Sequence, residues 1–185
     1  ILPTVDRAAR EAFRSLCIFR YVWPGLIRAL LAKGDWLPLT DAGKPDNYWW
    51  MVLQGTHLVL NVDERQLYPL SPTARRLIAL VLECEDPALF HAHHAQAYAT
   101  YLQMVQDPQV MLSQRATCWL EALFHAAQSG DLVLLQDTLS LLATLKCDND
   151  WGEIQPQVAG WLAGDVELHA VVGRVLGRDW SKSLT

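Results

Sequence analysis

Three histidines in one short segment, His91, His93 and His94, are the side chains with the clearest potential for chemistry. A helix that begins at Pro87 places His91 and His94 three residues apart on one face, while His93 points elsewhere. Two histidines on one face could ligate a metal ion, but a catalytic zinc usually takes three protein ligands, and the sequence contains no HExxH motif. A metal-dependent hydrolase that uses His91 and His94 is therefore one interpretation. We favour the other, a solvated or hydrogen-bonded histidine face, and expect no cofactor.

Three carboxylates surround an indole between residues 147 and 153, where Asp148, Asp150 and Glu153 flank Trp151. The glycine of this segment falls one position too early for a calcium loop, and no acid stands at the twelfth position. One interpretation is a solvated turn in which Asp150 caps the next helix. The other is an acidic, aromatic patch that contacts a basic partner protein, because tryptophan is favoured at interface hot spots.

Eight tryptophans give the chain many large aromatic side chains. Trp119 and Trp161 fall on apolar helical stripes, so we expect them in the core. The others of interest lie at breaks or beside loops, where a large indole is harder to bury completely. We predict that these indoles contact a partner: Trp36, Trp49, Trp50 and Trp151.

The common catalytic motifs are missing from the sequence. It has no GxSxG elbow and no glycine-rich phosphate loop, and no cysteine lies in a cationic setting that would lower its pKa. Four cysteines are spaced tens of residues apart without a CxxC pair, which is typical of buried thiols in a reducing compartment: Cys17, Cys84, Cys118 and Cys147. The sequence thus predicts a cytoplasmic protein that is not an enzyme.

Composition indicates one folded domain over residues 1–185. Apolar residues make up 51% and charged residues 19%, which excludes a disordered chain. The formal net charge is −5, so the basic surface of a nucleic-acid binder is not expected. Uninterrupted apolar stretches are too short for a membrane span. Residues 38–47 have the composition of a loop and are a candidate subdomain joint.

Helix signals are frequent along the chain. Ser or Asp before Pro72, Pro87 and Pro108 marks three helix starts. Glycine followed by aspartate, at Gly34, Gly130 and Gly164, marks places where one element ends and the next begins. We predict a tight helical hairpin at Gly130.

Apolar periodicity supports these helices. Ala74, Leu77, Ile78 and Val81 follow the spacing of an amphipathic helix. Residues 132–145 are apolar over most of a helical circumference, which is typical of a central, buried helix. Residues 49–62 fit either a helix or a two-stranded β-ribbon that turns at Gly55, and we favour the helix.

Together these patterns predict an all-α fold of stacked short helices, either an array of helical hairpins or an irregular bundle, with a small β-ribbon at 49–62 as the open alternative. We expect a non-catalytic protein–protein interaction domain that binds another, basic protein. An adaptor, a chaperone and an inhibitor that neutralises a toxin are the roles left open, as is the oligomeric state.

Overall fold

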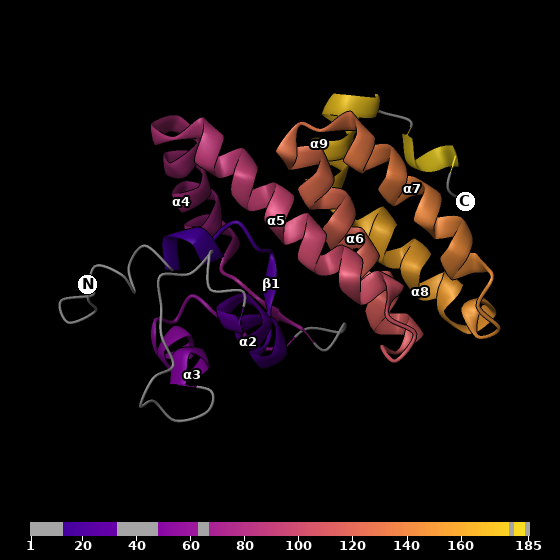
Figure 1. Ribbon diagram of the computed structural model, residues 1–185, viewed down its shortest axis with the longest axis horizontal. Coiled ribbons are helices and arrows are strands. Elements are labelled where there is room, and N and C mark those ends of the chain that lie inside the picture. Colours follow the sequence, from indigo (N-terminus) through magenta and orange to yellow (C-terminus); the bar gives the residue numbers. More distant parts are fainter. Residues whose placement is uncertain (1–12, 33–47, 63–66, 178–179, 184–185) are drawn as a thin grey trace. The chain divides into compact units, whose positions relative to one another are not determined.

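The computed structural model describes residues 13–32, 48–62, 67–177 and 180–183, and for residues 29–32, 182 and 183 it describes only the backbone (Figure 1). Trp36, the glycine at 34 and the loop 38–47 lie outside the described residues. The chain divides into two compact units, residues 1–93 and residues 94–185. Whether these units form the single domain that we expect stays a prediction.

Residues 1–93 combine short helices with a very small β-ribbon. A helical turn at 13–16 precedes β1 (Tyr21–Val22), and the elements that follow are α2 (Pro24–Ala32), α3 (Tyr48–Gly55), β2 (Tyr68–Pro69) and α4 (Pro72–Glu85). The two strands are antiparallel, with Tyr21 opposite Pro69. On the other side of β2, the amide of Leu60 donates to the carbonyl of Pro69 at 2.8 Å. Buried apolar residues of this unit include Ile18, Phe19, Val22, Leu26, Leu53 and Leu70.

The stretch from 49 to 62 changes conformation at its middle. It is helical as far as Gly55 and then turns through His57, whose φ of 58° lies in the left-handed region. Thr56 secures this turn, because its hydroxyl donates to the Leu53 carbonyl and accepts from the Leu58 amide. The predicted all-α fold with a small ribbon is confirmed, but the two strands of that ribbon lie at Tyr21–Val22 and Tyr68–Pro69.

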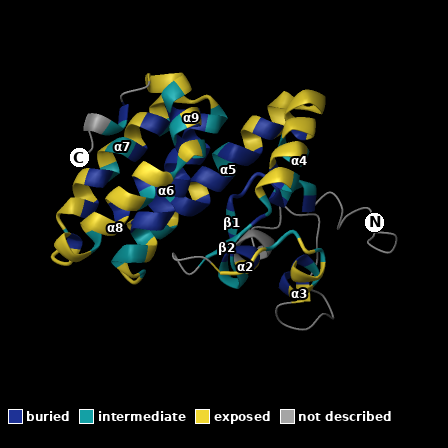
Figure 2. Ribbon diagram, turned by 180° about the vertical axis from the view of Figure 1, so that it is seen from behind, coloured by how far each residue is buried: buried dark blue, intermediate teal, exposed yellow. Residues whose placement is uncertain are grey.

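The described residues from 94 onward are mostly helical. The elements are the second part of α5 (Pro87–Gln106), α6 (Leu112–Ser129), α7 (Leu132–Lys146), α8 (Trp151–Gly164), α9 (Val166–Leu176) and the 3-10 turn η1 (Trp180–Ser183). Helix α6 packs against α7, α8 and α9, and every residue from 116 to 127 is buried (Figures 1 and 2). None of the helices in the described ranges is long and apolar enough to cross a membrane.

The prediction that residues 132–145 form the central helix is wrong. Helix α7 buries one side, which includes Leu135, Leu142 and Leu145, and leaves Leu132 and Val133 exposed. The central position belongs to α6, although it carries polar residues. Alanines on several sides of α6 let the neighbouring helices approach closely, whereas the bulk of α7 is leucine.

The predicted helix starts are confirmed at two of the three prolines. Helix α4 begins at Pro72 and α5 begins at Pro87, as predicted. The predicted start at Pro108 is wrong, because α6 begins at Leu112. Asp107 instead closes a turn between the helices: its side chain accepts from the Gln109 amide at 2.8 Å, and its carbonyl accepts from the Val110 amide at 3.2 Å.

The predicted hairpin between α6 and α7 is confirmed. Gly130 ends α6 with a φ of 75°, a conformation that glycine adopts without steric cost. Asp131 then caps α7, since one side-chain oxygen accepts from the Val133 amide at 2.8 Å and from the Leu134 amide at 3.3 Å. Asp165 caps α9 in the same way through the Leu168 amide.

Replacement of Asp131 with alanine is expected to lower the free energy of unfolding by about 1 kcal/mol, because two α7 amides lose their acceptor. Asp150→Ala is the matched control, since Asp150 also stands at an N-cap but its side chain makes no capping hydrogen bond. Urea denaturation of the two variants measures the difference. Equal losses would show that the Asp131 cap contributes nothing beyond its charge.

Candidate protein-contact surface

Helix α4 turns its apolar side outward. Leu77, Leu80 and Val81 have 59%, 55% and 47% of their surface exposed, whereas Arg75 on the opposite side is 4% exposed. Figure 2 shows much of this helix as exposed. Helices in globular proteins usually bury their apolar side and expose the charged one. The outward-facing leucines of α4 therefore reverse the usual pattern.

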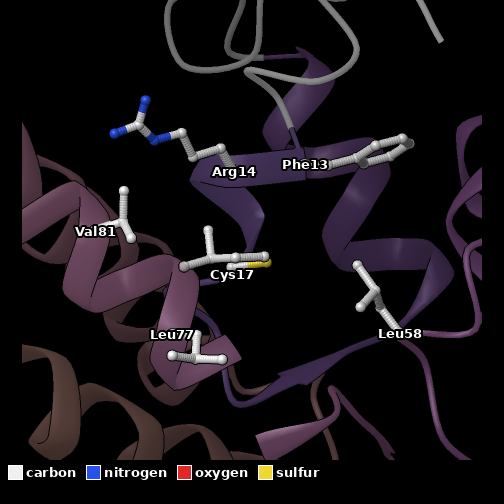
Figure 3. Close-up of a pocket in the computed structure, with 7 residues that line it drawn as sticks. Phe13, Arg14, Cys17, Leu58, Leu77 and Val81 are labelled. Atoms are coloured by element: carbon white, nitrogen blue, oxygen red, sulfur yellow. The ribbon is translucent and has the colours of Figure 1, made fainter. Parts of the chain in front are cut away.

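A groove of about 380 Å³ lies beside this face of α4. Figure 3 shows Leu77 and Val81 on α4, with Phe13, Arg14 and Cys17 on and just after the helical turn at 13–16, and Leu58 on the segment that follows α3. Arg14 forms an ion pair with Glu85 at the end of α4. Because the remaining walls are apolar, the groove suits apolar side chains better than a charged ligand.

The thiol in this groove is not a nucleophile at neutral pH. Burial raises the pKa of Cys17 to about 11, and the positive charge of Arg75 opposes this rise only in part. In the second unit, burial and then the Glu121 carboxylate raise the pKa of Cys118 to about 12. A thiolate is the reactive form of cysteine, so both groups are chemically quiet.

The three neighbouring histidines face different surroundings. His91 is exposed. His93 is buried, with its Nε2 atom 3.1 Å from the hydroxyl of Ser15. His94 is also buried, and its Nδ1 atom lies 2.8 Å from Nδ1 of His125 on α6. The structure thus does not gather His91 and His94 at one site.

A hydrogen bond between two imidazole nitrogens requires one N–H and one lone pair, so His94 and His125 cannot both carry a proton on these atoms. Tyr101 stacks on the His125 ring with centroids 5.4 Å apart, and Glu121 lies buried one turn earlier on α6. Among the described residues, no three histidine, cysteine or acidic side chains are grouped so that they could hold a metal ion. The histidine pair is best explained as a buried polar contact between α5 and α6.

The predicted acidic patch is partly used within the fold. Asp148 is half-buried, and its Oδ2 atom accepts from Nη1 of Arg115 at 3.1 Å. Asp150 stands at the N-cap of α8 as predicted, yet its side chain makes no capping hydrogen bond. Asp150 and Glu153 are exposed. A basic partner for these two carboxylates stays a prediction.

The indoles that we predict as partner contacts are buried wherever the structure describes them. Trp49, Trp50 and Trp151 are all buried. Trp50 packs edge-on against Tyr68, with ring centroids 4.9 Å apart. Trp151 closes a small cavity with Trp119 and α8 residues. An indole beside a helix end can still fold back over the core, so a contact surface built on these residues loses its support.

The two indoles that we expected in the core differ. Trp119 is buried, and its Nε1 atom donates to the Thr138 carbonyl at 2.7 Å. Trp161 is half-buried. The exposed apolar surface on α4 is not predicted by the sequence, because apolar periodicity locates a stripe on a helix without telling whether the core or the solvent faces it.

Comparison with protein-family models, with curated proteins and with solved structures found no match to this chain.

The buried His93 predicts a pH-dependent stability. Burial lowers the pKa of His93 below its usual 6.5, and the nearby Asp86 carboxylate opposes this shift. Above pH 6.5 both the folded and the unfolded chain hold this histidine neutral. As the pH falls through 6.5, the unfolded chain takes up a proton that the folded chain does not, so the free energy of unfolding decreases. His93→Gln should lose less stability than the wild type between pH 7 and pH 5, as measured by urea denaturation.

The control for this experiment is His91→Gln, which replaces the exposed histidine of the same helix and should preserve the wild-type pH dependence. If the two variants follow the same curve, His93 does not contribute to acid sensitivity.

A second prediction concerns Arg115, which joins three segments of the second unit. Its Nε atom donates to the Val105 carbonyl at 2.9 Å, and its Nη1 atom donates to Asp148. Arg115→Met should lower the free energy of unfolding by about 1–2 kcal/mol and Asp148→Asn by less, because the latter leaves the carbonyl contact intact. A double-mutant cycle checks the pair: the double variant should lose less than the sum of the two single losses. Strict additivity would mean that the ion pair is not energetically coupled.

Proposed function

We propose that this chain is a non-catalytic protein–protein interaction domain whose contact surface is the exposed apolar face of α4 with the adjoining groove. One observation carries the proposal: a regular helix exposes Leu77, Leu80 and Val81 while it buries Arg75. Contiguous exposed apolar surface with a polar rim is typical of a protein-contact site. An adaptor, a chaperone and an inhibitor of a toxin all act through such a surface.

Energetics support a partner at this face. Burial of a leucine or valine side chain stabilises a protein by about 1.5–3 kcal/mol relative to leaving it in water. The α4 face leaves about half of the surface of three such side chains in water. A partner that covers them would recover part of this free energy as binding affinity, after the entropy lost on association is subtracted.

The shape of the groove points to a protein rather than a small polar ligand. Its walls are apolar on both sides, and Arg14, the one charged side chain among the described residues that line it, already contacts Glu85. An apolar side chain from a partner helix would enter such a groove without losing hydrogen bonds to water.

Electrostatics also favour a protein over nucleic acid. The formal net charge of the chain is −5. The short helix α3 has the sequence YWWMVLQG and contains no lysine or arginine. It thus offers no charge to neutralise phosphates.

The test compares the wild type with a face variant, L77Q/L80Q/V81T. Because these side chains are exposed, the variant should keep its stability within about 0.5 kcal/mol. Each tagged protein is expressed in the native host, and the proteins that co-purify are quantified by mass spectrometry. We expect the amount of each specific partner that co-purifies with the face variant to be at least tenfold lower, because the apolar contacts that hold the partner are gone.

A matched control is available in the second unit, where the apolar residues Leu132, Val133 and Val166 are also exposed. The variant L132Q/V133T/V166T changes the same number of exposed apolar side chains and should retain the partners. If the wild type and both variants capture the same proteins in equal amounts, the α4 face is not the contact surface and the proposal fails.

A further inference from the structure

Four exposed residues of α4 form a continuous seam: Thr73, Leu77, Leu80 and Cys84. Their spacings of four, three and four residues are those of the contact positions of a coiled coil. Read backward along the helix, the spacings are the same. An antiparallel copy of the seam therefore places Thr73 opposite Cys84 and Leu77 opposite Leu80, in both directions at once.

Charges on one flank of the seam have the same symmetry. Arg76 and Glu83 are exposed, lie seven residues apart and share this flank. In an antiparallel pair of α4 helices, each Arg76 faces Glu83 of the other copy, so two opposite-charge contacts form. In a parallel pair, Arg76 would instead face the uncharged side chain of Val81 on the other helix. The charge pattern thus selects the antiparallel arrangement.

From the seam and its charges, we infer that the partner of the α4 face is a second copy of this chain, bound in the antiparallel orientation. The two-fold axis of this dimer passes through the middle of the seam, between Leu77 and Leu80. This inference rests on the proposed function, because it names the occupant of the same surface. A two-fold contact uses the same patch on both copies, which requires the self-complementarity that the seam provides.

The expected affinity is modest. Helix α4 has 14 residues, so the seam covers about three turns. Interfaces that bury less than about 1,200 Å² in total are typical of weak or transient complexes. The groove beside Val81 adds apolar area at the edge of the seam. We expect a dimer that forms at about 10–100 μM and dissociates on dilution.

The first experiment measures the dimer by sedimentation velocity over a range of concentrations. R76E and E83R should each weaken dimerisation about tenfold, since each places like charges together twice. The double variant R76E/E83R should recover the wild-type affinity, because the exchange restores both contacts. A mixture of the two single variants should form a heterodimer more readily than either variant dimerises alone. A double variant that stays as weak as the single ones would overturn the charge pairing.

The second experiment fixes the orientation with a short bis-maleimide crosslinker. Cys84 and Cys147 are exposed, whereas Cys17 and Cys118 are buried, so C147S leaves one reactive native thiol. In that background T73C should give a covalent dimer that joins position 73 of one copy to Cys84 of the other, identified by peptide mass spectrometry. Two controls are made in the same background. M111C, at an exposed site outside α4, should give no dimer that joins position 111 to Cys84, and T73C/C84S should give no dimer that joins the two copies of position 73. Crosslinks from Cys84 to Cys84 and from position 73 to position 73 would indicate a parallel pair and overturn the inference.

The outcomes separate this inference from the proposed function. A wild type that stays monomeric up to about 500 μM overturns self-pairing, because even weak interfaces associate at that concentration. If the face variant nevertheless loses other co-purified proteins, the α4 face is a contact surface for a different partner. If the protein is monomeric and the face variant loses nothing, both proposals fail.

Discussion

The burial of α6 on all sides is the constraint on which residues 94–185 depend. Twelve consecutive residues, 116–127, have no exposed face, so each polar group among them must be satisfied inside the protein. His125 meets His94 at 2.8 Å, and the Trp119 indole donates to the Thr138 carbonyl. These two hydrogen bonds fix how α5 and α7 are rotated about their own axes relative to α6. Apolar packing alone would tolerate several rotations, whereas a buried hydrogen bond tolerates one.

The first unit distributes its polar groups in the opposite way. There the charged Arg75 lies inside, next to a thiol whose pKa burial raises, while leucines of the same helix lie outside. A chain under selection only for stability would exchange these positions, because each exposed leucine gives up burial free energy. The cost is understandable if the exposed side serves binding. Local departures from the rules of folding are expected where function imposes its own requirement.

Sequence patterns predicted those features that depend on a few neighbouring residues. Proline at 72 and 87 and glycine at 130 act through their own backbone, so the helix ends they mark can be recognised without the fold. Features that depend on distant packing could not be predicted. Residues 132–145 are richer in leucine than α6, yet α6 is central, because burial is decided by which helices surround a segment. Likewise, periodicity locates the apolar stripe of α4 but does not tell whether the core or the solvent faces it.

The connection at Gly130 and Asp131 has a kinetic consequence. With two residues between α6 and α7, the extensive packing of these helices consists of contacts between positions close in sequence. Closing so short a loop costs little chain entropy, and proteins dominated by local contacts fold fast. The helical pair is thus able to assemble before the more distant α8 and α9 arrive. During synthesis on the ribosome, α6 would already be covered by α7 along one side while α8 and α9 were still being made.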